Sequence, residues 1–159
     1  MFFWSTRTET QQAGKALGSL LSTGDVVALI GDLGTGKTTL TQGIAQGLGI
    51  VTPVNSPTFN LVQEHIGRIP LFHCDPYRLS SPEDLLDFGF EEYFERGGVV
   101  VVEWADKVES LLPTDRLTLT LEIERSPDPF AEEIPRRCQV VAGGKRSETL
   151  KAEWEAMLK

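Results

Sequence analysis

The sequence predicts a three-layer α/β sandwich in which helices cover a mixed, mostly parallel sheet. Residues 26–30 and 99–102 are entirely apolar, as strands buried on both faces of a parallel sheet are. Helical patterns alternate with strand patterns along the chain, which is typical of α/β folds. The chain of 159 residues has no repeat, linker or low-complexity tract, so we expect a single domain over residues 1–159.

Four segments place apolar residues at helical spacing: residues 8–21, 38–47, 81–96 and 147–158. Thr8 can cap the first helix, because a threonine hydroxyl accepts a hydrogen bond from an amide of the first turn. The third helix has a proline and two acidic residues at its start and is expected to break near Gly89. The last helix carries Trp154 on its apolar face and is expected to pack on its own domain.

Strand patterns occur in six segments: residues 26–30, 59–66, 69–74, 99–102, 117–123 and 136–142. The second and third of these are joined at Gly67 and Arg68, which predicts a hairpin. Leucine or isoleucine alternates with polar residues over residues 117–123, so this strand should have one face in water. The hairpin and the late strands make the predicted sheet mixed.

The chain is acidic, with 15 Lys and Arg residues against 23 Asp and Glu residues and a net charge of −8. This balance argues against a protein that coats nucleic acid or an anionic membrane by bulk charge. Cys74 and Cys138 lack the spacing of a zinc site, and two unpatterned cysteines fit a reducing compartment. The start has no signal-peptide pattern and no apolar run could cross a bilayer, so we expect a soluble cytoplasmic protein.

A glycine-rich loop follows the first buried strand. Residues 31–38 match the phosphate-binding pattern G-x-x-x-x-G-K-[ST] in full and stand between a strand and a helix, as the motif requires. Glycines let successive amides point at phosphate oxygens, and the following helix adds its positive N-terminal end. Lys37 would reach the β- and γ-phosphates, and Thr38 would offer its hydroxyl to Mg²⁺. The loop therefore predicts a nucleoside triphosphate site.

Acidic residues follow two of the predicted strands. Glu103 comes directly after residues 99–102, and Asp75 comes directly after residues 69–74. A nucleoside triphosphatase needs a carboxylate that holds the Mg²⁺ shell or orients the attacking water, and buried parallel strands end at the ligand edge of the sheet. Both acids are therefore candidates for a nucleotide or metal role, and Glu103 fits the pattern more cleanly.

Other residues near these segments allow more than one interpretation. Thr58 lies in a Ser-Pro-Thr-Phe loop, where it could sense Mg²⁺ or the γ-phosphate, or serve only as a turn hydroxyl. Trp104, directly after Glu103, could touch a substrate or partner, or pack in the core or at the rim. Arg78 could pair with Asp75 or contact phosphate, and from the sequence alone we interpret it as a surface residue. We interpret His73 as a structural residue.

The base of the nucleotide is predicted to be adenine. Guanine-specific phosphate-loop proteins usually carry an Asn-Lys-x-Asp or Thr-Lys-x-Asp segment, and this chain has neither. Thr39 stands where the third glycine of a dinucleotide-binding loop would be, which disfavours that class. Small-molecule kinases share the loop but usually add an arginine-rich lid, whereas the arginines here are scattered apart from the pair Arg136 and Arg137.

Four segments, in order and spacing, resemble the TsaE family, the small ATPases of bacterial tRNA threonylcarbamoyladenosine synthesis. They are the phosphate loop with Thr39, the loop at residues 56–59, the segment His-Cys-Asp-Pro-Tyr-Arg at residues 73–78, and Glu103 with Trp104. The resemblance covers about residues 5–104. It implies a P-loop NTPase fold and an ATPase that uses ATP and Mg²⁺ and is weak alone.

The resemblance also implies partners. They would be the threonylcarbamoyl-transferase subunit, which has a sugar-kinase-like fold, and that subunit's paralogue, bound together as a complex. The chain would hydrolyse ATP to reset this complex between turnovers. It would meet tRNA only indirectly, through these subunits, and would bind neither DNA nor a membrane.

Individual roles follow from the same resemblance. The residues expected to bind the nucleotide are Thr10, Asp32, Leu33, Gly34, Thr35, Gly36, Lys37, Thr38 and Thr39. The residues expected to act in catalysis are Lys37, Glu103, Asp75 and Thr58. The residues expected to hold the metal are Thr38, Glu103 and Asp75. Trp104 matches a tryptophan of the family, whereas Cys74, Pro76, Ala105 and Asp106 depart from the family's usual residues.

Two alternatives stay open at this point. The chain could be a small-molecule kinase, in which case a metabolite would accept the phosphate. It could also be a nucleotide-gated assembly module whose hydrolysis is incidental, in which case assembly with ATP analogues would not depend on Glu103.

Overall fold

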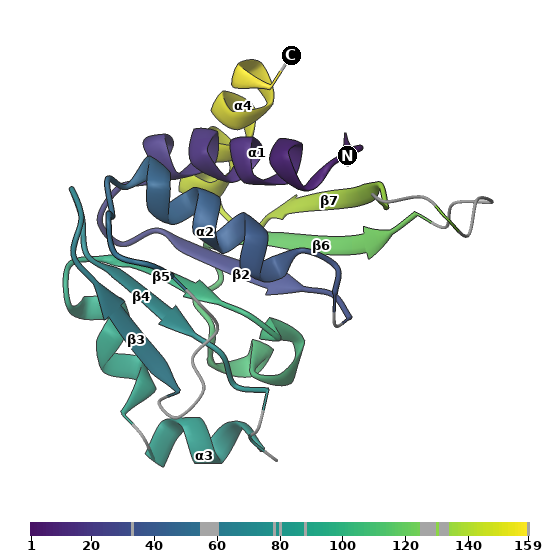
Figure 1. Cartoon of the computed structure of the whole chain (residues 1–159). Helices are drawn as coiled ribbons and strands as arrows, with labels where there is room; N and C mark the ends of the chain where they lie inside the picture. The colour runs from purple at the N-terminus through teal and green to yellow at the C-terminus, as the bar shows by residue number, and fades with distance from the viewer. Residues whose placement is uncertain are drawn as a thin grey trace.

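The computed structural model describes residues 1–32, 34–54, 61–77, 79, 81–87, 89–124, 130 and 134–158 (Figure 1). Within these residues, the strands are β1 (Phe2–Trp4), β2 (Val26–Ile30), β3 (Val62–His65), β4 (Leu71–Cys74), β5 (Val99–Val102), β6 (Leu117–Ile123) and β7 (Arg136–Ala142). The α-helices are α1 (Arg7–Leu20), α2 (Lys37–Gly47), α3 (Pro82–Asp87) and α4 (Lys145–Met157). Short 3-10 helices are η1 (Phe90–Glu95), η2 (Ala105–Lys107) and η3 (Glu109–Leu111). None of the helices in these ranges is long and apolar enough to cross a membrane.

The described strands form one sheet with a parallel centre. Its order is β1-β7-β6-β2-β5-β4-β3, and β6, β2, β5 and β4 run in the same direction. Antiparallel strands continue the sheet on both sides, with β3 beside β4 and with β7 and β1 beyond β6. The predicted α/β fold with a mixed sheet is therefore confirmed, and the hairpin predicted at Gly67 and Arg68 is the β3–β4 pair.

Two separate apolar clusters cover the faces of the sheet. On one face, α1, α2 and α4 pack over a cluster that includes Leu29, Val101 and Leu40 (Figure 1). On the other face, α3 and the 3-10 helices cover a cluster that includes Phe72 and Val100. Because successive residues of β5 alternate between the two clusters, this strand is buried on both sides. Its uninterrupted run of valines is the consequence of that double burial.

Helices α1 and α2 approach each other closely because glycines line both sides of their contact. Gly14 and Gly18 of α1 meet Gly43 and Gly47 of α2, and a Cβ placed on Gly43 would lie 2.2 Å from the carbonyl oxygen of Gln11. Ordinary contacts of a Cβ begin near 3.4 Å, so no side chain fits at this point. The contact holds α2, and with it the loop that precedes α2, against α1.

The N-cap of α1 is Thr6, so the prediction of Thr8 is wrong. The Thr6 hydroxyl accepts a hydrogen bond from the Glu9 amide at 3.1 Å, and the Glu9 carboxylate accepts one from the Ser5 amide at 2.6 Å. Both threonines fit the capping-box pattern, because Glu9 or Gln11 follows three residues later. The carboxylate of Glu9 is a stronger hydrogen-bond acceptor than the side-chain amide of Gln11. The earlier threonine, Thr6, is therefore the N-cap.

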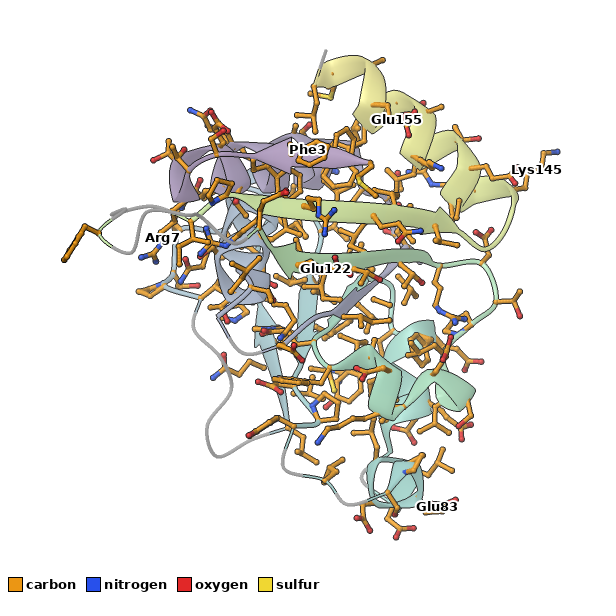
Figure 2. All side chains as sticks on the ribbon, turned by 90° about the vertical axis from the view of Figure 1, so that its right-hand side faces the viewer. Phe3, Arg7, Glu83, Glu122, Lys145 and Glu155 are labelled. Carbon is orange, nitrogen blue, oxygen red and sulfur yellow. The ribbon has the colours of Figure 1, made fainter. Side chains whose placement is uncertain are left out.

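Helix α4 packs on its own domain, as predicted. Trp154 has no exposed surface, and its indole N–H donates to the carbonyl oxygen of Ala13 at 2.9 Å. Phe2 and Trp4 lie against the same indole, with ring centroids 4.8 and 6.1 Å away. Figure 2 shows this end of the molecule, with α4 beside β7 and Phe3 on β1. Strand β1 was not predicted, since its three residues are too few to show an alternating pattern.

Candidate functional site

The phosphate loop connects the central strand β2 to the start of α2. Gly34 and Gly36 have φ angles of 83° and 101°, in the left-handed region that favours glycine. Gly36 is also the N-cap of α2, so the first-turn amides of this helix open toward the loop. Leu33, a predicted binding residue, lies outside the described residues.

Lys37 is folded back over its own loop. It has 5% of its surface exposed, and its ammonium donates to the carbonyl oxygens of Gly31 and Asp32, the latter at 3.0 Å. The same ammonium lies 3.8 Å from the centre of the Trp104 ring, a cation–π contact. Burial lowers the pKa of Lys37, and the negative charge of Glu103 opposes that shift.

Thr38 and Glu103 come together at the start of α2. The Thr38 hydroxyl lies 3.3 Å from Oε1 of Glu103. Glu103 follows β5, the neighbour of β2, and has 2% of its surface exposed. The structure therefore brings together a hydroxyl from the phosphate loop and an acid from the adjacent strand, both of which the sequence analysis singled out. This is the arrangement of side chains that holds Mg²⁺ in P-loop NTPases.

The second carboxylate oxygen of Glu103 contacts a buried histidine. Oε2 lies 2.5 Å from Nε2 of His73, which has no exposed surface. The other ring nitrogen of His73 has no hydrogen-bond partner within the described part of the chain. His73 was predicted to be structural, but its imidazole lies against a candidate metal-binding acid. Only the register between β4 and β5 reveals this contact, and sequence spacing carries no such information.

Asp75 follows β4 and belongs to the same electrostatic cluster. Its Oδ1 accepts a hydrogen bond from the Tyr77 amide at 3.1 Å. Burial raises the pKa of Asp75, and the charge of Glu103 raises it further, while the charge of Lys37 acts in the opposite direction. The charges of Glu103 and Lys37 thus both act on the carboxyl group of Asp75.

Trp104 has a strained backbone beside the loop. Its φ angle is 54°, and no other non-glycine residue in the described ranges has a positive φ. The indole packs against the Tyr77 ring, with centroids 4.8 Å apart, and Lys107 donates to the Tyr77 carbonyl oxygen at 2.9 Å. Together with the contact to Lys37, this places Trp104 in direct touch with the predicted site and not in a remote part of the core.

Arg136 lies against the phosphate loop, although the sequence analysis did not include it in the site. A Cβ placed on Gly36 would be 2.9 Å from Nε of Arg136, at the start of β7. Arg136 has no acidic partner among the described residues, whereas the adjacent Arg137 pairs with Glu122 and Glu124. The sequence showed the arginine pair, but which member reaches the loop depends on the direction each side chain takes from β7.

The remaining predicted residues differ in their relation to the loop. The Thr35 hydroxyl donates to the Asp32 carbonyl oxygen at 2.8 Å and so stabilises the loop itself. Thr39 is buried in the first turn of α2. Thr10 is fully buried, and its hydroxyl bonds at 3.3 Å to a carbonyl oxygen one turn earlier in α1, not to the loop. Thr58 lies outside the described residues.

The donor set suits a Mg²⁺ ion that is held jointly by the protein and a nucleotide. Within the described residues, no group of three or more His, Cys, Asp or Glu side chains could hold a metal ion alone. Mg²⁺ usually keeps several waters and takes one or two protein oxygens together with phosphate oxygens. Thr38 and Glu103 offer such oxygens next to the phosphate loop, so these residues fit the ion.

Comparisons with known proteins find a matching family, similar sequences and a similar solved structure. The sequence model of the family described as "Threonylcarbamoyl adenosine biosynthesis protein TsaE" matches residues 4–131. The protein from Bacillus subtilis (strain 168) named "tRNA threonylcarbamoyladenosine biosynthesis protein TsaE" is 45% identical over 115 residues, 72% of each chain. A protein of the same name from Nostoc sp. (strain PCC 7120) is 38% identical over 143 residues, 87% of each chain.

A solved structure shares the fold over nearly the whole chain. It is described as "Crystal structure of Bacillus subtilus YdiB" and has a TM-score of 0.78 and 37% sequence identity. The match covers 99% of this chain and 96% of that chain. The family match, the curated relatives and the common fold agree with the resemblance seen in the sequence motifs, and the chain belongs to the TsaE family of tRNA threonylcarbamoyladenosine biosynthesis proteins.

Proposed function

We propose that this chain binds ATP and Mg²⁺ at its phosphate loop and hydrolyses the ATP during tRNA threonylcarbamoyladenosine synthesis. The observation that carries the proposal is the 3.3 Å contact between the Thr38 hydroxyl and the Glu103 carboxylate at the start of α2. A hydroxyl on the loop and an acid on the next strand are the protein's share of a Mg²⁺–nucleotide site. The names of the curated relatives support the pathway.

The side chains of the site have distinct roles in the proposed reaction. The loop amides and the N-terminal end of α2 bind phosphate oxygens. The Lys37 ammonium exchanges its contacts with loop carbonyl oxygens and with Trp104 for contacts with phosphate. Thr38 and Glu103 hold Mg²⁺, which when bound neutralises charge on the phosphates. Asp75, which the family resemblance assigns to catalysis and metal binding, shares the metal or orients the attacking water.

The proposed partners are the threonylcarbamoyl-transferase subunit and its paralogue, bound as a complex. Hydrolysis would reset that complex between rounds of threonylcarbamoyl transfer. The net charge of −8 supports docking on protein subunits over direct binding of tRNA, because the field of the chain repels a polyanion. The cytoplasm is the proposed location.

ATP hydrolysis by the purified chain, alone and with both partner subunits, tests the proposal. We expect slow turnover alone, strong stimulation by the pair, and loss of both rates in Lys37→Ala. Basal turnover without stimulation would contradict the pathway but not the site. Phosphate transfer to a metabolite would favour a kinase instead. Assembly that needs ATP analogues and is unchanged in Glu103→Gln would favour a nucleotide-gated module.

A further inference from the structure

His73 and Glu103 come from neighbouring strands whose register brings their side chains to the same face. β4 and β5 are parallel, and His73 pairs with Val101, two residues before Glu103. Residues two apart on a strand share a face, so His73, Val101 and Glu103 point to the side that α2 covers. The contact of 2.5 Å between Nε2 of His73 and Oε2 of Glu103 follows from this register.

The hydrogen bond from His73 gives the two carboxylate oxygens of Glu103 different partners. A carboxylate can only accept, so Nε2–H of His73 is the donor to Oε2. Oε1 is then the oxygen that faces the Thr38 hydroxyl. Because His73 has no exposed surface and Glu103 only 2%, water has little access to replace this bond. The imidazole therefore keeps the carboxylate in one orientation.

We propose that His73 is a positioning residue that holds the Glu103 carboxylate with Oε1 toward Thr38, and so sets the Mg²⁺ dependence of nucleotide binding. This inference rests on the proposed function, since it needs Thr38 and Glu103 to share a divalent cation with the phosphates. Removing a group that hydrogen-bonds to a metal ligand commonly lowers metal affinity roughly 10- to 100-fold. We expect an effect of that size on the gain in affinity that Mg²⁺ provides.

Replacing His73 by glutamine or by asparagine, two amides of different length, distinguishes a residue that orients Glu103 from one that only fills space. The Nε2 group of a glutamine reaches about as far as Nε2 of histidine, so His73→Gln retains a donor to Glu103. The shorter side chain in His73→Asn carries the same amide but cannot reach the carboxylate. His73→Leu removes the donor and keeps an apolar side chain of similar bulk in the buried position.

The measurement is the dissociation constant of the non-hydrolysable analogue AMP-PNP, by calorimetry, in saturating Mg²⁺ and in EDTA. We expect Mg²⁺ to tighten binding in the wild type and in His73→Gln. In His73→Asn and His73→Leu the gain from Mg²⁺ should fall roughly 10- to 100-fold, while affinity in EDTA stays near wild type. Thermal melts of each variant establish that it is folded, and the two amide variants carry the test if His73→Leu does not fold.

The outcomes distinguish this inference from the proposed function. If Mg²⁺ tightened AMP-PNP binding equally in His73→Gln and His73→Asn, the role of His73 would be overturned and the proposed function would stay intact. A loss of the gain in a folded His73→Gln variant would also overturn it, because the donor would then not suffice. A wild-type protein whose affinity does not respond to Mg²⁺ would overturn both.

Discussion

The closeness of α1 and α2 makes Gly43→Ala a sharp test of how the phosphate loop is held. A Cβ at this position would lie 2.2 Å from the Gln11 carbonyl oxygen and 3.0 Å from Cα of Gly14. Both neighbours are backbone atoms, which cannot rotate away as a side chain can. Since ordinary contact begins at 3.4 Å, the two helices would have to separate locally by roughly 1 Å.

The expected loss in the free energy of unfolding of Gly43→Ala follows from two opposing effects. Overpacking a well-packed contact costs about 1–3 kcal/mol, and a backbone clash belongs in the upper part of that range. Alanine offsets about 1 kcal/mol of this cost, because it favours a helix over glycine by that amount. The net loss in the free energy of unfolding is therefore about 1–2 kcal/mol. For a chain of this size that loss lowers Tm by about 2–8 °C.

Thermal or urea unfolding of the purified variant measures this loss directly. Gln46→Ala is the matched control, because it puts the same residue on the exposed face of the same helix and should change stability by no more than about 0.5 kcal/mol. A Tm of Gly43→Ala equal to or above that of the wild type would show that helix propensity outweighs the clash. The close contact would then not be what holds α2 in place.

Two further predictions concern the chemistry of the site. Glu103→Gln should keep nucleotide binding and lower ATP turnover about 100-fold or more, because the amide cannot supply the negative charge that the metal side of the site needs; unchanged turnover would assign this role to Asp75. Arg136→Ala should weaken nucleotide binding about tenfold in a calorimetric titration, since it removes a charged donor beside Gly36. Arg137→Ala serves as its control because the Arg137 guanidinium pairs with Glu122 and Glu124; equal effects of the two substitutions would refute a specific role of Arg136.

The features that could be predicted from sequence are those encoded in local patterns. The buried strands β2 and β5 appear as uninterrupted apolar runs because both of their faces are covered. The phosphate loop is recognisable because glycine, lysine and threonine must stand at fixed spacing for the backbone to curl around an anion. Glu103 and Asp75 were found for a related reason: both follow strands that end at one edge of the sheet.

The features that could not be predicted depend on register, chain packing and competing local signals. His73 reaches Glu103 only because β4 pairs with β5 in one particular register. Arg136 is far from the loop in sequence. It lies beside Gly36 only because β7 pairs with β6 and β6 pairs with β2, the strand that leads into the loop. The cap of α1 was predicted at Thr8 and lies at Thr6; both threonines fit a capping box, so the local pattern does not distinguish them. Such contacts are properties of the folded chain and not of a sequence window.

The proposed function requires that ATP bound at the phosphate loop supports tRNA modification. The decisive measurement is the threonylcarbamoyladenosine content of tRNA in cells in which Lys37→Ala replaces the wild-type protein. We expect the variant to fold, because Lys37 contributes contacts to the loop and not to the apolar clusters. We expect the modified nucleoside to fall to the level of cells that lack the protein. A wild-type level of modification, with the folded variant as the only source of this activity, would show that tRNA modification does not depend on this site.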